Sequence, residues 1–294
     1  MRLKFPGVWA RLVCAIVLFS AIYLLPAVIP AATAVSSAQN PDTMMPEQNV
    51  AKAREILNQL VDALGGPAYL EVRDRECDGR RARIGHNGEM DGYIDFYDYW
   101  RYPDKHRTDY SKKRNIIDLY SGDQGWTMDR AGVSEAPATA VSDFQAVVKN
   151  SVDNLLRNRL RDPALNLHYA GRGIVDMLEA DWVEISEPDS TLRLAVARST
   201  HLLLRSVVAS VNQEMNERTE ETTIYTNYRR KDGVMVAMQI SRERDGRRYY
   251  QAFYDTCTFN PNFPEETFTR AALEKRYAEV GNKKDRDKYR NARD

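Results

Sequence analysis

The sequence is poor in the residues that build metal and catalytic sites. Among its 294 residues are four histidines and three cysteines, and no two histidines have a metal-binding spacing. An H-E-x-x-H motif, a G-x-S-x-G motif, a phosphate loop and a dinucleotide glycine pattern are all absent. His86 and His106 stand in a turn and at a strand start, where an exposed histidine is more common than a ligand. We therefore expect no metal, no cofactor and no enzymatic activity.

Net charge is absent as well, because 42 basic residues balance 42 acidic ones. Residues 1–34 contain three of the basic residues and none of the acidic ones, so their removal leaves a net charge of −3. Nucleic-acid binding requires a concentrated basic surface, which this composition does not indicate. We expect no nucleic-acid partner.

The first 34 residues have the order of a secretory signal. Three basic residues precede an uncharged run over 12–29, and the Ala-Thr-Ala triplet at 32–34 offers a cleavage site of small residues. An uncleaved N-terminal anchor is the alternative, but Pro26 and Pro30 interrupt the run before the roughly 20 apolar residues of a membrane span. We predict a signal peptide over 1–34 and export to the periplasm.

Two cysteines, Cys77 and Cys257, remain after such a cleavage, and both lie in segments with strand character. In an oxidising compartment they can form a disulfide. Two separate buried thiols are the alternative, because the sequence does not give the distance between them. The pairing stays open at this level.

Apolar residues at helical spacing begin after a small, polar, proline-containing segment over 35–48, which we interpret as a linker. The first helix is predicted from Val50 to Leu64, with a charged outer face, and it ends at Gly65-Gly66. A helix with one apolar and one charged face lies on the surface of the protein, with its apolar face over another part of the fold.

Two further helices are predicted later in the chain. Ser142 and Gln145 have the spacing of a capping box, and an apolar stripe follows them until Asp162-Pro163. A closing helix covers 269–280, and the charged tail over 282–294 is expected to be solvated. The folded domain should therefore span 49–281.

Short strands separated by turn residues fill the rest of the chain, which predicts antiparallel pairing. An open sheet of this size usually curls or splits. We predict an α+β fold with one curled antiparallel sheet and amphipathic helices over its mouth; a flat two-layer sandwich is the alternative. The predicted strands are 68–77, 89–100, 105–112, 115–120, 165–170, 174–186, 191–198, 202–212, 220–230, 234–243 and 247–258.

One of these strands has a purely apolar face. It lies between two Asp-Gly turns, and its apolar face consists of Val234, Val236, Met238 and Ile240. This face points inward, toward the core of the protein or toward a ligand. The flanking arginines, Arg242 among them, are expected to keep the strand ends soluble rather than to bind phosphate.

The segment over 92–110 is rich in aromatic residues and carboxylates. Sugar binding by stacking and hydrogen bonding is one interpretation, and a glycosidase pair is another. Asp91, Asp95 and Asp98 do not share one parity, so they cannot all face one site on a regular strand. We favour an aromatic strand in the wall of the sheet, with its polar side in water.

Several stretches resemble one known family when they are taken in order. A helix ending in Gly-Gly is followed by RYPDKHRTDY (101–110), DLYSGDQGWTMD (118–129), NYRRKDGVMVAMQI (227–240) and NPNFPEETF (260–268). This order is similar to that of the outer-membrane lipoprotein carriers (LolA-like) and lipoprotein-sorting proteins of the bacterial periplasm. The resemblance covers roughly residues 50–270.

The resemblance implies an unclosed barrel with helices over a hydrophobic hollow that holds acyl chains. Arg107 matches the arginine after the proline turn, as a polar contact near the hollow, and Trp126 matches the tryptophan after the glycine turn. The chain departs from the family at two places. It has Ala237 where relatives often have proline. It also reads Ala197-Arg198-Ser199-Thr200 where relatives often have an acidic residue ahead of the threonine. Both put the cargo in doubt, because a fold does not carry its function with it.

The predicted function is therefore an exported, non-enzymatic binding protein for lipid or the acyl chains of a lipoprotein. Its partners would include an inner-membrane donor or an outer-membrane acceptor. A glycan-binding envelope protein that uses 92–110, or an assembly scaffold that binds through a sheet edge, is the alternative. The predicted ligand-binding residues are Val234, Val236, Met238 and Ile240, with Trp126 and Phe144 as lid contacts.

Overall fold

The computed structural model describes residues 40–85, 88–212 and 217–280, which belong to one compact unit. The predicted signal peptide, the charged tail over 282–294 and His86 lie outside the described residues. Along the described ranges, no helix combines the length and the apolar character that a membrane crossing requires.

Thirteen antiparallel strands form a single sheet, in the order β6-β5-β4-β3-β2-β1-β13-β12-β11-β10-β9-β8-β7. The sheet is not closed into a barrel, because β6 and β7 lie at its two edges. The predicted α+β class and unclosed half-barrel are therefore confirmed. The strands are β1 (Asp74–Ile84), β2 (Met90–Arg101), β3 (Lys105–Tyr110), β4 (Ile116–Ser121), β5 (Gln124–Asp129), β6 (Gly132–Glu135), β7 (Leu167–Val175), β8 (Leu178–Ser186), β9 (Ser190–Ala197), β10 (Leu203–Asn212), β11 (Glu217–Lys231), β12 (Val234–Arg244) and β13 (Arg247–Phe259).

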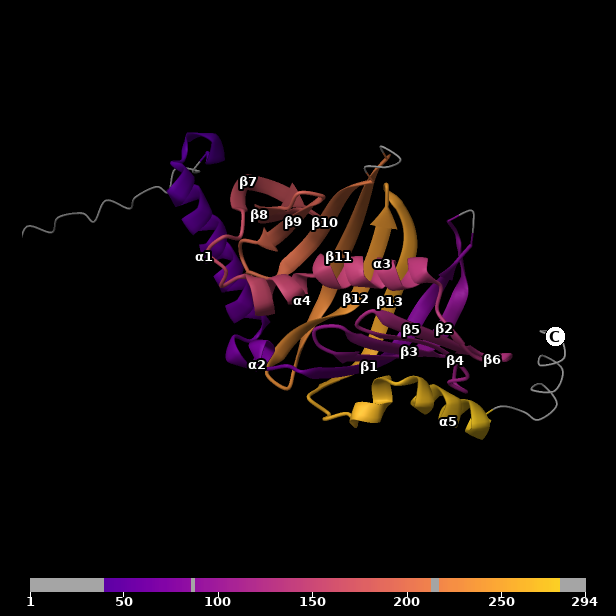
Figure 1. The fold of residues 1–294 in the computed structure, drawn as a ribbon. Helices are drawn as coiled ribbons and strands as arrows, with labels where there is room; N and C mark the ends of the chain where they lie inside the picture. Colours follow the sequence, from indigo (N-terminus) through magenta and orange to yellow (C-terminus); the bar gives the residue numbers. More distant parts are fainter. Residues whose placement is uncertain (1–39, 86–87, 213–216, 281–294) are drawn as a thin grey trace, which may run out of the picture. The chain divides into compact units, whose positions relative to one another are not determined.

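The helices lie on both faces of this sheet, as Figure 1 shows. The segment α3–α4 runs across the strands of one face, with α1 beside β7 and β8, while α5 lies along β5 and β6. The helical segments are η1 (Pro41–Thr43), α1 (Pro46–Leu64), α2 (Pro67–Leu70), α3 (Ala138–Lys149), α4 (Val152–Asn154), η2 (Leu155–Arg159), η3 (Glu265–Phe268) and α5 (Arg270–Val280).

The strand order explains why α3 crosses the sheet. The chain leaves β6 at one edge and enters β7 at the opposite edge, so the connection between them must pass over the whole sheet. This connection contains α3, α4 and η2. The topology therefore places these helical segments across the concave face of the curled sheet.

Four predicted segments differ from the structure. Residues 68–70, predicted as strand, belong to the short helix α2, which Pro67 begins. Residues 46–48, assigned to the linker, are already part of α1. The predicted break between 170 and 174 is absent, because β7 continues to a turn at Asp176-Met177. Strands β5 and β6 were not separately predicted.

The predicted capping box at Ser142 is also wrong. The helix already begins at Ala138, and the Ser142 hydroxyl donates to the carbonyl of Thr139 within it. The real serine cap is Ser151, whose Oγ accepts a hydrogen bond from the backbone N–H of Asn154 at 3.0 Å. The predicted single helix is thus two helical pieces with a break at residues 150–151.

The pleat divides the side chains of β2 between the two faces of the sheet. Phe96, Asp98 and Trp100 point to the face that α3 crosses, while Tyr97 and Tyr99 pack in the cluster beneath η3 and α5. A larger cluster joins α1 and η2 to strands β7–β10 on the first face. Both faces of the sheet are therefore covered by helix, but over different strands.

A disulfide joins Cys77 on β1 to Cys257 on β13. The two residues are direct partners in the antiparallel register, and both side chains are buried. The pairing of β1 with β13 is the place where the two meanders, β1–β6 and β7–β13, join into one sheet. The disulfide thus covalently links the two halves.

Candidate functional site

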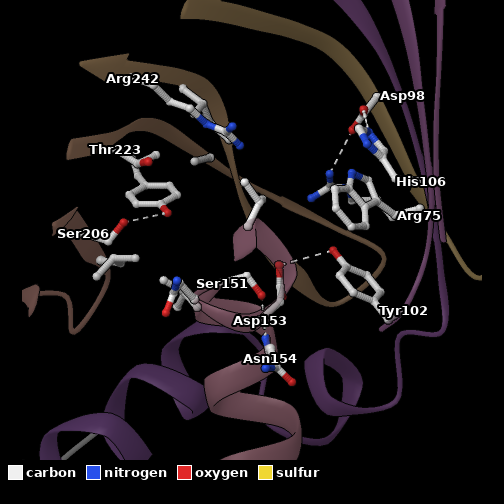
Figure 2. A pocket seen from close by; sticks show the side chains of 18 of the residues that line it. Arg75, Asp98, Tyr102, His106, Ser151, Asp153, Asn154, Ser206, Thr223 and Arg242 are labelled. Atoms are coloured by element: carbon white, nitrogen blue, oxygen red, sulfur yellow. Dashed lines mark hydrogen bonds and ion pairs between the residues drawn. The ribbon is translucent and has the colours of Figure 1, made fainter. Parts of the chain in front are cut away.

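A cavity of about 1120 Å³ lies between the sheet and the segment α3–α4. Its wall comes from β1, β2, β3 and β10–β13, and its cover comes from α3, α4 and η2. We call this cavity the hollow; Figure 2 shows some of the side chains that line it.

Strand β12 gives the hollow an apolar and a charged part. Val234, Val236 and Ile240 line the hollow, and Met235 and Ala237 at the positions between them line it as well. Arg242 and Arg244 follow Ile240 at alternate positions and also face the hollow. Because a strand rises about 3.4 Å per residue, the apolar part from Val234 to Ile240 is roughly 20 Å long.

Met238, the remaining member of the predicted apolar face, does not line the hollow. It is 2% exposed and packs in a small cluster with Phe96, Tyr254 and the disulfide. Its apolar contacts are therefore already satisfied within the protein. Of the four predicted residues, Met238 is core and the other three face the cavity.

Asp98 lies in the opposite wall and is held by Arg75 and His106. It accepts hydrogen bonds from Arg75 at 2.9 Å and from His106 Nε2 at 2.6 Å (Figure 2). Burial alone would raise the pKa of Asp98, but the charge and hydrogen bond of His106, and then those of Arg75, outweigh it and hold the pKa at about 2. The predictions of an exposed His106 and of a solvated polar side for this strand are therefore wrong.

An aromatic stack connects this wall to α3. His106 lies on Trp100 with 4.1 Å between ring centroids, and Phe144 from α3 lies on Tyr120 at 4.8 Å. The rings of Phe144 and His106 are nearly parallel, 6.2 Å apart. Phe144 is the one buried residue of α3, so this stack is the apolar contact that holds the helix over the sheet, beside the exposed ion pairs of Lys149 with Glu187 and Asp189. Phe144 thus lies in the cover, where we expected it, although it does not itself line the hollow.

A second carboxylate, the part-buried Asp153 on α4, ties the cover to the base of the sheet. It accepts hydrogen bonds from Tyr69 at 2.9 Å, Arg157 at 3.1 Å and Tyr102 at 3.3 Å. Burial, together with the charge of Asp153, raises the pKa of Tyr102 to about 12, so this hydroxyl remains a donor. Arg157 also contacts the rings of Tyr69 and Tyr102 at 4.1 and 4.6 Å.

Trp126 and Arg107 do not belong to the hollow, which contradicts the placement implied by the family resemblance. Tyr99, Arg107, Leu119 and Trp126 are partners across β2–β5, so they all point to the same face, and that face packs under η3 and α5. Arg107 pairs there with Asp109 at 2.7 Å. The alternation of strand side chains places both residues on the wrong side for a ligand in the hollow.

The aromatic segment over 92–110 does not form one sugar site. Its rings are divided between the two faces, as the parity of its positions predicts, and Asp98 is already bound by Arg75 and His106. Asp91 is exposed at the start of β2. Asp98 and Asp91 therefore do not form a pair of free carboxylates around stacked rings.

Sequence reasoning missed most of the polar wall. Arg75, Arg81, Asp153 and Arg242 line the hollow, together with several tyrosines. For Arg242, the expectation of a solubilising role at a strand end is wrong, because its side chain faces the cavity. Arg242 lies an even number of positions after Val234 on the same strand, so both side chains point to the same face. This alternation was the signal in the sequence that could have placed Arg242 in the hollow. The tyrosines are Tyr69, Tyr102, Tyr110, Tyr225, Tyr228, Tyr249, Tyr250 and Tyr254.

Comparisons with known proteins find similarity in structure but not in sequence. No family model and no curated sequence matches the chain. The structure of a DUF1329 family protein from Desulfovibrio piger aligns with 76% of this chain and 99% of that one, at 12% identity and a TM-score of 0.56. A putative outer membrane lipoprotein-sorting protein domain from Vibrio parahaemolyticus aligns with 77% of this chain and 100% of that one, at 11% identity and a TM-score of 0.50.

The chain shares its fold with the DUF1329 family protein and with this putative lipoprotein-sorting domain. A LolA superfamily protein from Nitrosomonas europaea also matches, over 75% of this chain and 99% of that one, at 14% identity and a TM-score of 0.48. At these identities the likeness concerns the fold alone, which is what the resemblance in the sequence predicted. Within the described ranges, no three His, Cys, Asp or Glu side chains are grouped to hold a metal ion.

Proposed function

We propose that this protein is an exported, non-enzymatic envelope protein that binds lipid, or the acyl chains of a lipoprotein, in the hollow. The observation that carries the proposal is a cavity of about 1120 Å³ with an apolar strip along β12, covered by a helix that rests on one aromatic residue. A cavity of this size lies slightly above the range of about 300–1,000 Å³ that is usual for small-molecule sites.

The energetics favour an extended apolar ligand. Each buried methylene contributes about 0.8 kcal/mol, so a chain of ten methylenes along the strip gains roughly 8 kcal/mol before the costs of ordering it. Val152, Leu203 and Val234 belong to one cluster at this part of the hollow, which extends the apolar wall to the cover. An acyl chain fits this strip better than a compact polar ligand does.

Three further observations support the proposal. The disulfide is typical of an exported protein, in agreement with the predicted signal peptide. The buried Asp98 and the part-buried Asp153 are each paired with an arginine, which suits a structural role better than catalysis. The similar structures include a putative outer membrane lipoprotein-sorting protein domain, and on this likeness we propose an inner-membrane donor or an outer-membrane acceptor as partner of this chain.

Native mass spectrometry of the protein purified from a periplasmic extract tests the proposal. We expect adducts with the mass of lipids, and uptake of a fluorescent fatty acid after these are removed. Val236→Glu should reduce that uptake at least tenfold, because it places a charge in the apolar strip. Gln239→Glu, on the opposite face of the same strand, is the matched control and should bind normally. A clean apo mass without fatty-acid uptake would refute the proposal.

A further inference from the structure

Two part-buried arginines that face the hollow have no carboxylate partner within 4.0 Å among the described residues. They are Arg81 on β1 and Arg242 on β12. Three of the other arginines that line the hollow have a carboxylate partner, and the fourth, Arg73, is exposed. The pairs are Arg75–Asp98 at 2.9 Å, Arg157–Asp153 at 3.1 Å and, at an exposed arginine, Arg244–Glu221 at 3.3 Å.

Both arginines lie against the same tyrosine. The guanidinium carbon of Arg81 is 4.9 Å from the ring centroid of Tyr250, and that of Arg242 is 5.2 Å from it. The Nε atom of Arg242 is buried and has no hydrogen-bond partner in the described part of the chain. Figure 2 shows this side chain directed into the hollow. Tyr250 thus brings two cations together at one place in the wall.

The nearest acidic groups are already engaged. Arg81 has one hydrogen bond, to the hydroxyl of Tyr110 at 3.3 Å, and that hydroxyl also interacts with Asp118. Glu221 is the partner of Arg244. Asp98, which also acts on Tyr250, is paired with Arg75, and Asp143 and Asp245 are exposed at the rim of the hollow. The site around Tyr250 therefore has an excess of positive charge.

The position of this charge relative to the apolar strip indicates the ligand. Arg242 follows Ile240 on the same face of β12, so the cationic site begins where the apolar strip ends. We propose that the hollow binds an anionic amphiphile, with its acyl tail along Val234 to Ile240 and a carboxylate or phosphate headgroup between Arg81 and Arg242. This inference rests on the proposed function and adds the class of ligand.

The physical reason is the cost of burying an unpaired cation. A partly buried guanidinium without an anion loses solvation that the cation–π contact with Tyr250 replaces only in part. A carboxylate or phosphate would accept charge-assisted hydrogen bonds from both arginines. At 1.5–3 kcal/mol for such a bond, the headgroup should improve binding by about 10- to 100-fold.

Isothermal titration of the full chain, freed of bound lipid, tests the inference with four probes. These are hexadecanoate, hexadecyl phosphate, methyl hexadecanoate and inorganic phosphate, with the amphiphiles below their micelle concentrations. We expect both anionic amphiphiles to bind about 10- to 100-fold more tightly than the methyl ester. Arg242→Gln and Arg81→Gln should remove this difference without weakening binding of the ester.

Arg229→Gln is the matched control, because it removes an exposed arginine from the neighbouring strand β11 and should leave all four affinities unchanged. Arg242→Lys keeps the charge and should retain most of the preference, which separates a headgroup site from a folding defect. Equal binding of the acid and its methyl ester would overturn the inference but leave the proposed function intact. Inorganic phosphate that binds as tightly as hexadecyl phosphate would show a site for a free anion instead. If neither hexadecanoate nor its ester binds, the proposed function fails as well.

Discussion

Asp98 lies between Arg75 and His106 in the wall of the hollow, and these neighbours decide its role. In the sequence it is one of three carboxylates among aromatic residues, a pattern that also occurs in sugar-binding sites. In the structure it is 5% exposed and bound by Arg75 and His106. A carboxylate held in this way stabilises the fold as an anion and costs stability when it is protonated.

The depressed pKa of Asp98 predicts how stability depends on pH. Its folded pKa of about 2 lies below the ordinary value of 3.8, so its contribution is present above about pH 4 and is lost as the pH falls toward 2. The difference corresponds to a free energy on the order of 2 kcal/mol.

Urea unfolding of the wild type and of Asp98→Asn at several pH values between 6 and 2 measures this contribution. The wild type should be the more stable at pH 6, and the two curves should converge toward pH 2. Asp91→Asn, at an exposed position, is the control and should show no such convergence. Parallel curves for wild type and Asp98→Asn would contradict the prediction.

At the scale of elements, the segment α3–α4 is attached to the sheet at separate places. Helix α3 depends on Phe144, while α4 depends on the hydrogen bonds to Asp153. The break between the two pieces lies at Asn150 and Ser151. Elements with few buried contacts open most easily, so α3 is the part of the cover that should admit a ligand.

Phe144→Ala should release α3 while the sheet stays folded. Loss of the aromatic contacts should lower the opening free energy of this helix by roughly 3 kcal/mol. Hydrogen exchange followed by mass spectrometry should show faster exchange over 138–149 and unchanged exchange in β10–β13. Gln145→Ala, exposed on the same helix, is the control. Unchanged protection of α3 in Phe144→Ala would contradict this assignment of the contact.

At the scale of the whole molecule, the sheet consists of two meanders that meet only where β1 pairs with β13 in the strand order. These strands are about 180 residues apart in the chain, and such long-range pairing has a large entropic cost. The disulfide between Cys77 and Cys257 closes this long loop covalently. It therefore stabilises the one connection on which the continuity of the hollow depends.

Removal of the disulfide should destabilise the protein strongly. In the chain-entropy model, a loop of about 180 residues corresponds to roughly 5 kcal/mol. The Cys77→Ala, Cys257→Ala double variant should therefore unfold at a clearly lower urea concentration than the oxidised protein. Native protein should also resist alkylation at both cysteines until it is reduced. Ready labelling of both thiols before reduction would show that the bond is absent.

Much of the fold could be predicted because its signals are local. The alternation of apolar residues and the Asp-Gly turns predicted β11, β12 and β13 to within a few residues. The stripe from Val50 to Leu64 predicted α1, although not its first turn. Residues 68–70 and Ser142 were assigned wrongly because a short helix and a capping pattern carry weak signals that tertiary contacts override.

The sequence by itself determined the class of fold, the apolar face of β12 and the division of the side chains of 92–110 between the two faces of the sheet. These features depend on periodicity along the chain. Only the tertiary structure decided which face of the sheet is covered by which helix, and therefore that Trp126 and Arg107 lie away from the hollow. It also decided that Arg81 and Arg242 meet at Tyr250. Those contacts join strands far apart in sequence, and their geometry depends on a register and a curvature that no local pattern contains.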